Sequence, residues 1–211
     1  RDAYFGSGGF ETGAYLSKHK RESEEDYTFR RNNAYYLNYF APIVNALVDP
    51  IFKKNPLRDY HGSAERIIKS FSLDADAAGT NIQIFIKRAA VMAKVYGISF
   101  IVVDNARNVD SRSQQEMLQR RQFPYAYVLE PDNLEEYGID KTGDLEYIKF
   151  KEIAHIESGT IQYRYVYFDR TSWKIWGDGI ALQQGTHNLG RVPVVPLFSR
   201  MLEQKTMRPT P

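Results

Sequence analysis

Residues 81–104 have the sequence NIQIFIKRAAVMAKVYGISFIVVD, and this stretch decides the fold. Asn81 is a preferred N-cap residue, and the apolar residues after it recur every three or four positions, which predicts an amphipathic helix. Gly97 predicts the end of that helix, because glycine tolerates the backbone conformation that follows a helix C-terminus. The next seven residues, ISFIVVD, have almost no polar side chain and are typical of a strand buried on both faces. We therefore expect a helix that leads through one glycine into a central strand.

The residues before this stretch are predicted to be helical. Ser23 begins a sequence that resembles a capping box, and apolar residues recur at helical spacing over residues 36–51. Pro42 interrupts this pattern, so it either kinks one long helix or lies in the first turn of a second helix over about residues 42–53. A short helix is also expected over residues 64–71.

Beyond Pro124 the apolar residues alternate with polar ones, which is the pattern of antiparallel strands. Turn-forming sequences separate four such segments, 124–130, 145–153, 161–169 and 173–176. The last apolar segment, 190–198, contains two prolines and is therefore expected to be an edge strand or an extended connector. The expected fold class is α+β, with N-terminal helices packed on a mainly antiparallel β-sheet.

The expected domain organisation follows from local composition. Residues 1–15 contain four glycines, and we expect residues 1–22 to form a flexible N-terminal arm. Residues 23–198 are expected to form one α+β domain, and residues 199–211 a truncated connector toward a further region. The chain starts with Arg1 and has neither an initiating methionine nor a signal-peptide pattern, which indicates a piece of a longer protein.

Overall composition excludes several classes of protein. The 211 residues contain no cysteine, which excludes disulfide scaffolds, thiolate zinc sites and cysteine nucleophiles. The formal net charge is +2, so the chain is not a polycation that coats nucleic acid. No apolar run approaches the ~18 residues of a membrane span, so no membrane partner is expected.

The sequence also lacks the spacings on which common active sites depend. No histidine lies three or four positions from another on a predicted helix, and no HExxH motif is present. There is no G-x-S-x-G motif and no phosphate-binding loop of the G-x-x-x-x-G-K-[ST] type. We therefore expect no catalytic residue, no metal site and no cofactor, and we expect that the protein is not an enzyme.

One enzyme class stays open as the alternative. Pro131-Asp132, followed by Glu146 and Lys149, resembles the restriction-endonuclease pattern, in which a Pro-Asp pair precedes an acid-x-Lys segment on a strand. Such a site needs the acid and the lysine two positions apart, so that both side chains emerge on the metal-binding face. Here they are three positions apart, and a bulge in the strand would be needed to bring them to one face. The alternative function is a metal-dependent nuclease or phosphodiesterase.

Two further groups of residues are candidates for binding. A polar segment follows the central strand and contains arginines that can reach phosphates. The candidate nucleic-acid contacts are Arg107, Arg112, Arg120 and Arg121. Tyr163, Tyr165 and Tyr167 alternate along one predicted strand and so point to one face. This row is either an exposed stacking platform, as a binding module would need, or part of a core that a helix covers, which is the interpretation we favour.

Charge is distributed unevenly along the chain. Residues 81–129 contain seven Lys and Arg against three Asp and Glu, residues 130–157 contain three against nine, and residues 158–211 contain seven against three. Surfaces of opposite sign on one domain suit head-to-tail association of copies, although solvated loop charges would give the same counts. The candidate subunit-interface residues are Glu135, Glu136 and Asp140.

Three pieces of the sequence occur in a recognisable order. The first, residues 24–56, is a helical segment with a tyrosine and asparagine run that ends in VDPIFKKNP. The second is the helix, glycine and strand of residues 81–104, and the third is FPYAYVLEPDN, residues 123–133, followed by a hairpin. In this order the pieces resemble the N-terminal half of a tailed-bacteriophage portal protein, over roughly residues 15–198. Pro42 departs from the family's pattern, because it lies inside the long helix of the first piece.

The resemblance implies a function, partners and a location. The chain would be the wing region of a portal subunit, a structural domain without an active site. Portal subunits form a ring, usually of twelve copies, at one vertex of the capsid. Terminase pumps double-stranded DNA through this ring, and head-completion and tail proteins dock on it. The protein would be made in the host bacterial cytoplasm and located in the virion, and the family's stem and clip would follow the wing in sequence. Under the alternative, a nuclease would act on phage DNA.

Overall fold

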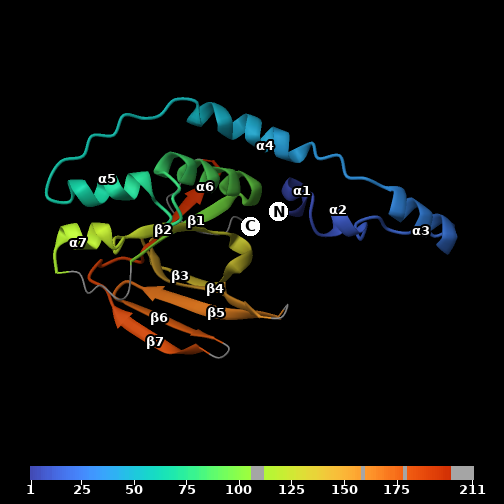
Figure 1. The fold of residues 1–211 in the computed structure, drawn as a ribbon. Coiled ribbons are helices and arrows are strands. Elements are labelled where there is room, and N and C mark those ends of the chain that lie inside the picture. The colour runs from blue at the N-terminus through green and yellow to red at the C-terminus, as the bar shows by residue number, and fades with distance from the viewer. Residues whose placement is uncertain (106–111, 158–159, 178–179, 201–211) are drawn as a thin grey trace. The chain divides into compact units, whose positions relative to one another are not determined.

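The computed structural model describes residues 1–105, 112–157, 160–177 and 180–200. The chain divides into two compact units, Arg1–Pro56 and Leu57–Pro211. Within the described residues, these units contain seven α-helices and two antiparallel β-sheets (Figure 1). The α+β class expected from the sequence is therefore confirmed. The expected domain boundaries at residues 22 and 198 stay predictions.

The first unit is helical. Its elements are α1 (Asp2–Phe5), α2 (Gly9–Thr12), α3 (Glu24–Asn33), α4 (Phe40–Val48) and the 3₁₀ helix η1 (Asp49–Phe52). Ser23 caps α3, because its hydroxyl oxygen accepts a hydrogen bond from the backbone N–H of Asp26 at 3.1 Å. Ala34 after α3 has an extended backbone, and Pro42 lies in the first turn of α4. Of the two arrangements expected around Pro42, the second helix is therefore correct and the single kinked helix is wrong.

The second unit starts with helices. They are α5 (Glu65–Leu73), α6 (Ile82–Tyr96) and, after the first strand, the short α7 (Gln114–Gln119). The side-chain oxygen of Asn81 accepts hydrogen bonds from the backbone N–H groups of Gln83 and Ile84, both at 3.0 Å, which confirms Asn81 as an N-cap. Gly97 ends α6 with a φ of 87°, a conformation that residues with a Cβ rarely adopt.

The strands of the second unit form two sheets. The first has the order β2-β1-β8, with β1 (Ile98–Asp104) between β2 (Tyr125–Leu129) and β8 (Val194–Phe198). β1 is therefore a central strand and β8 an edge strand, as predicted. The second sheet has the order β3-β4-β5-β6-β7, and its strands are β3 (Leu134–Ile139), β4 (Leu145–Glu157), β5 (Thr160–Asp169), β6 (Ser172–Gly177) and β7 (Ile180–Thr186). The sequence pattern did not predict β3 and β7, which are the two edges of this sheet.

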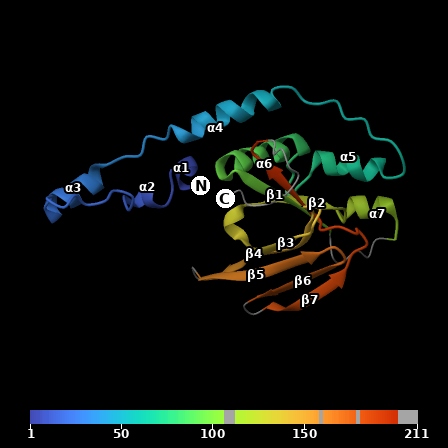
Figure 2. The same cartoon turned by 180° about the vertical axis from the view of Figure 1, so that it is seen from behind.

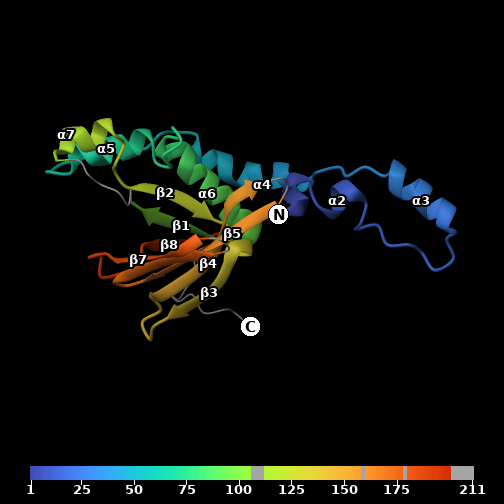
Figure 3. The ribbon, with the colours of Figure 1, turned by 60° about the horizontal axis from the view of Figure 1, so that its bottom comes forward.

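Apolar side chains of both sheets meet in the main core. Phe100 and Val102 of β1 belong to one buried cluster with Phe150 of β4 and Val166 of β5. A second cluster, which includes Phe85 of α6, covers the other face of the three-stranded sheet. The resulting order of layers, α5 and α6, then the three-stranded sheet, then the five-stranded sheet, is visible from the front, from behind and in the turned view (Figures 1, 2 and 3). One face of the five-stranded sheet therefore points away from the core.

Candidate interaction surfaces

The tyrosine row lies on the outer face of the five-stranded sheet. Val166 and Phe168 of β5 point into the core and are only 1% and 3% exposed. Tyr163, Tyr165 and Tyr167 alternate with them on the opposite face, where Tyr163 is exposed and the other two are half-buried. The expectation that a helix covers these rings is wrong, because α5 and α6 lie on the far side of the three-stranded sheet (Figure 1).

Two pairs of aromatic rings stack on this outer face. Tyr165 of β5 is the direct register partner of Trp176 of β6, and their ring centroids are 5.9 Å apart at an interplanar angle of 26°. Tyr147 of β4 stacks on Tyr167 of β5 with the same centroid distance and an angle of 24°. Cross-strand aromatic pairs of this kind stabilise a sheet and present a continuous flat surface.

Two lysines lie over these rings. The ammonium nitrogen of Lys149 is 5.4 Å from the ring centroid of Tyr165 and 5.7 Å from that of Trp176. The ammonium nitrogen of Lys174 is 5.8 Å from the ring centroid of Tyr167. All three distances suit a cation–π contact. We define the aromatic–lysine face as Tyr147, Lys149, Tyr165, Tyr167, Lys174 and Trp176.

Two of the predicted interface residues border the aromatic–lysine face. Glu136 of β3 accepts a hydrogen bond from the Tyr147 hydroxyl at 2.8 Å, and this bond raises the pKa of Tyr147. Glu135 forms an ion pair with Lys151 of β4 at 3.4 Å, and both side chains are about one-third exposed. Glu135 and Glu136 are therefore adjacent residues of the edge strand β3, and each has a partner in the same chain.

Asp140, the third predicted interface residue, holds the turn between β3 and β4. Its Oδ1 accepts hydrogen bonds from the backbone N–H of Thr142 at 2.8 Å and from the Thr142 hydroxyl at 2.6 Å. The guanidinium of Arg170 forms an ion pair with Oδ2. The Thr142 hydroxyl and Arg170 hold the pKa of Asp140 well below its ordinary value. Asp140 therefore stabilises its own turn, and its carboxylate is largely occupied.

Two of the four predicted arginine side chains, those of Arg120 and Arg121, form ion pairs within the chain beside α7. Arg107 lies outside the described residues. Arg120 forms an ion pair with Glu116 at 2.8 Å, and the backbone N–H of Arg112 donates to the same carboxylate at 3.0 Å. Arg121 forms an ion pair with Asp74, and its guanidinium carbon lies 5.6 Å from the Phe123 ring centroid. The Arg120 and Arg121 side chains thus neutralise carboxylates of the second unit.

The residues of the nuclease pattern lie on two different elements. Asp132 belongs to the 3₁₀ helix η2 (Pro131–Asn133) and accepts a hydrogen bond from the Tyr96 hydroxyl at 2.8 Å. Glu146 and Lys149 both belong to β4, and Glu146 is exposed. Among the described residues, no group of three or more His, Asp or Glu side chains is placed to hold a metal ion.

A cavity of about 540 Å³ lies beside the end of β1. Asp104, Trp173 and His187 are among the residues that line it. The backbone N–H of His187 donates to the Thr171 carbonyl at 2.7 Å, and its Nε2 lies 3.1 Å from the Asp169 carbonyl oxygen. These bonds hold His187 against the turn between β5 and β6, a contact between segments that no local sequence pattern predicts.

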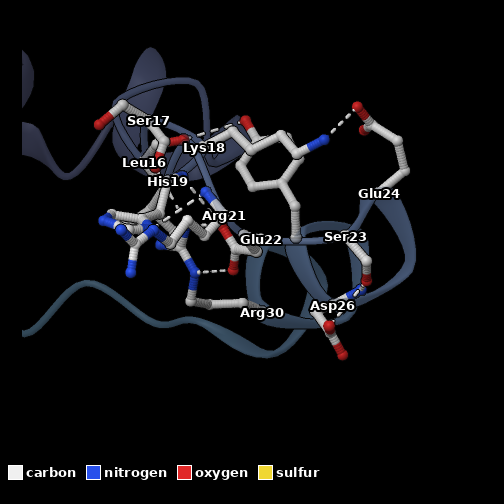
Figure 4. Close-up of polar contacts among 11 residues, drawn as sticks. Leu16, Ser17, Lys18, His19, Arg21, Glu22, Ser23, Glu24, Asp26 and Arg30 are labelled. Carbon is white, nitrogen blue, oxygen red and sulfur yellow. Dashed lines mark hydrogen bonds and ion pairs between the residues drawn. The ribbon is translucent and has the colours of Figure 1, made fainter.

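A polar cluster closes a loop in the first unit (Figure 4). The guanidinium of Arg30 donates to both carboxylate oxygens of Glu22, from Nε and from Nη2, each at 2.8 Å. The same Nη2 donates to the Ser17 carbonyl at 3.0 Å, and the backbone N–H of His19 donates to Glu22 at 3.1 Å. The Arg30 bonds, together with that from His19, lower the pKa of Glu22 to about 2. The cluster fastens residues 17–22 to α3.

Comparison of the sequence with protein-family models and with curated proteins found no match. No helix among the described residues is long and apolar enough to span a lipid bilayer.

The sequence contained part of the signal for the aromatic–lysine face. The alternating tyrosines of β5 predict one shared face, whereas Lys149 is a candidate only for the nuclease site. Lys174 and Trp176 have the same two-residue spacing, which places both on one face of β6. The missing information was the pairing of β4, β5 and β6, because only the register brings these side chains together.

Proposed function

We propose that the chain is a structural subunit of a tailed-bacteriophage portal and forms its wing region. The observation that carries this proposal is the order of three sequence pieces, over residues 24–56, 81–104 and 123–133. The arrangement of the second piece supports it, because α6 and β1 form the junction between the helical layer and the three-stranded sheet. The interruption between α3 and α4 is the point at which the chain departs from the family's long helix.

In this role the subunit associates with copies of itself in a ring, usually of twelve, at the capsid vertex. Double-stranded DNA passes through the ring under the action of terminase, and capsid, head-completion and tail proteins bind around it. A conduit must not hold DNA tightly, because each neutralised phosphate adds binding free energy that opposes movement. The ion pairs of Arg120 with Glu116 and of Arg121 with Asp74 support this role, since they reduce the positive charge available to phosphates.

The contact between neighbouring subunits is proposed to involve the acidic segment 130–157. Glu135 and Glu136 lie on β3, an edge strand of the five-stranded sheet, where another copy can approach. The single 3.4 Å contact between Glu135 and Lys151 leaves carboxylate oxygens for a partner. Asp140 is a weaker candidate because Arg170 and Thr142 already occupy it. The opposing surface is the basic segment 81–129 or 158–208 of the neighbour.

Electron microscopy of the full-length protein tests the proposal. Negatively stained particles are expected to be rings with a central hole, and light scattering after size exclusion is expected to give the mass of about a dozen subunits. Particles without a central hole, or a monomer at micromolar concentration, would rule out the portal function.

A metal-dependent nuclease that acts on phage DNA is the alternative. One observation favours it: the pairing of β3 with β4 is irregular at Glu146, since Gly138 faces Tyr147 while Ile139 faces Leu145. An extra residue in a strand changes the direction in which nearby side chains point. Glu146 and Lys149, which are three positions apart, need such a change to lie on one face of β4. Cleavage of plasmid DNA that depends on Mg²⁺ or Mn²⁺ and is lost in Glu146→Ala would support the nuclease, whereas an inert protein would contradict it.

A further inference from the structure

We propose that the aromatic–lysine face binds single-stranded nucleic acid. The observation behind this proposal is the combination of two stacked ring pairs with two ammonium groups on one exposed sheet face. The proposal goes beyond the portal function, in which double-stranded DNA passes through the ring. It concerns a surface of the second unit alone.

The charges on and around this face favour an anionic ligand. Among the described residues, Lys149 and Lys174 contact aromatic rings and form no ion pair with a carboxylate. At the border, Glu135 is paired with Lys151 and Glu136 accepts a hydrogen bond from Tyr147, so each carboxylate has one partner in the same chain. Two cations therefore remain available at the centre of the face, where an incoming phosphate can replace or share the ring contact.

The rings favour a ligand that is flat as well as anionic. Single strands expose base planes next to their phosphates, and each base that stacks on an aromatic side chain contributes to affinity without sequence specificity. In a duplex the base planes are stacked on one another and are not free to contact the Tyr165 and Trp176 rings. An acidic protein segment supplies the negative charge but no row of planar groups. A single strand is therefore the ligand that uses both features.

Tryptophan fluorescence gives a direct measurement of binding. The chain has two tryptophans, and Trp173→Phe leaves Trp176 on the aromatic–lysine face as the only one. A thymidine oligonucleotide of about 12 nucleotides is expected to quench Trp176 at low salt, because a base stacks on or beside its ring. If two phosphates are neutralised, the affinity falls about 25-fold between about 20 mM and about 200 mM salt. Absence of quenching at low salt would overturn the proposal.

Side-chain variants test the two components separately, with fluorescence anisotropy of the labelled oligonucleotide as the readout. Lys149→Gln together with Lys174→Gln is expected to remove most of the salt dependence. Lys69→Gln is the matched control, because Lys69 lies on α5 in an ion pair with Glu65. Tyr165→Ala is expected to weaken binding about tenfold, while Tyr165→Phe keeps the ring and the affinity. An equal loss in the Lys69 control, or no loss in Tyr165→Ala, would contradict the proposal.

Competition distinguishes a single strand from other anions. A duplex of the same length is expected to compete at least tenfold less well than the single strand, and polyglutamate is expected to compete only at low salt. Equal competition by the duplex, or by polyglutamate at about 200 mM salt, would mean that the face recognises charge alone and would overturn the proposal. Ring formation by the Tyr165→Ala protein, which keeps every charge of the proposed subunit contact, is expected to be unchanged, so the portal function and this proposal fail or succeed independently.

Discussion

The hydroxyl of Ser99 donates a hydrogen bond to the Ala89 carbonyl at 3.0 Å and thereby joins β1 to α6 inside the core. Ser99 has no exposed surface, and it is the one buried polar residue among those that the structure describes. Its small side chain also lets the helix approach the sheet closely. The junction predicted from residues 81–104 is therefore held by a specific polar contact as well as by apolar packing.

Substitution of Ser99 measures this contact. Ser99→Ala removes one buried hydrogen bond and is expected to lower the free energy of unfolding by about 1 kcal/mol. Ser99→Val adds a larger branched side chain and is expected to cost about 1–3 kcal/mol through overpacking. Urea denaturation followed by circular dichroism gives both values. The half-buried Ser70 on α5 is the control, and Ser70→Ala should change stability by less than about 0.5 kcal/mol. A Ser99→Val protein as stable as wild type would show that neither the hydrogen bond nor the small size of Ser99 is needed between β1 and α6.

Gly97 sets the change of direction from α6 to β1. A Cβ at this position would meet no atom within 4 Å, so any cost of substitution arises from the φ of 87°. Gly97→Ala is expected to destabilise the second unit by about 1–2 kcal/mol. Gly97→Asn is expected to cost less, because asparagine tolerates positive φ better than alanine does. Equal stability of the alanine variant and wild type in thermal unfolding would show that the backbone is not strained here.

The contact between Glu22 and Arg30 is expected to slow hydrogen exchange of backbone amides in residues 17–22. Glu22→Gln removes the charge from the paired carboxylate and should increase hydrogen exchange at the backbone N–H of His19, which donates to Glu22. Glu25→Gln, an exposed change on α3, is the control and should leave this exchange unchanged. The pKa of Glu22 is lowered to about 2 from an ordinary 4.5. In the wild-type protein the His19 amide should therefore stay protected from hydrogen exchange through weakly acidic pH. This protection should be lost as the pH falls toward 2. Protection that is unchanged in Glu22→Gln would contradict this role.

Asp169 should contribute to stability in a pH-dependent way. Burial alone would raise its pKa, but hydrogen bonds from Ser172 and Thr171 outweigh that effect and lower the pKa to about 2. The ionised form is thus favoured in the folded state, and its contribution is present above pH of about 4 and is lost between about 4 and 2. Asp169→Asn is expected to cost about 1–2 kcal/mol at neutral pH and less at pH 2. The free energies of unfolding of wild type and Asp169→Asn, measured between pH 7 and pH 2, should converge as the pH falls. A constant difference between them would show that the Asp169 charge does not stabilise the fold.

Reversal of charge on β3 tests the proposed subunit contact. Glu135→Lys together with Glu136→Lys is expected to reduce the fraction of full-length protein in rings at low salt, as counted by electron microscopy. The fold should survive, because an exposed pair such as Glu135 with Lys151 contributes at most about 1 kcal/mol. Glu11→Lys makes a reversal of the same kind at an exposed position on α2 and is the control. Rings in undiminished number would remove Glu135 and Glu136 from the interface.

Local sequence patterns predicted most elements because their causes are local. Asn81 caps its own helix, Gly97 ends it, and Ser23 begins α3, so each signal lies within a few residues of its effect. The edge strands β3 and β7 escaped prediction because strand alternation reports burial, and an edge strand with consecutive polar residues buries little. The sequence also predicted one sheet where the structure has two. This difference has another cause, because strand order depends on pairing between distant segments.

By itself the sequence determined the α+β class and the central position of β1. It left two alternatives for Pro42 and two for residues 190–198, and the structure decided in favour of the second helix α4 and the edge strand β8. Only the tertiary structure decided which face of β5 is covered, and it placed the tyrosine row outward beside Lys149 and Trp176. It also paired Arg121 with Asp74 and Asp140 with Arg170, residues 47 and 30 positions apart in the chain. Helix caps and turns act between neighbours in sequence, whereas the faces of a sheet depend on which distant strands share a hydrogen-bond register. The two ion pairs depend on the packing of helix ends and turns that are distant in sequence.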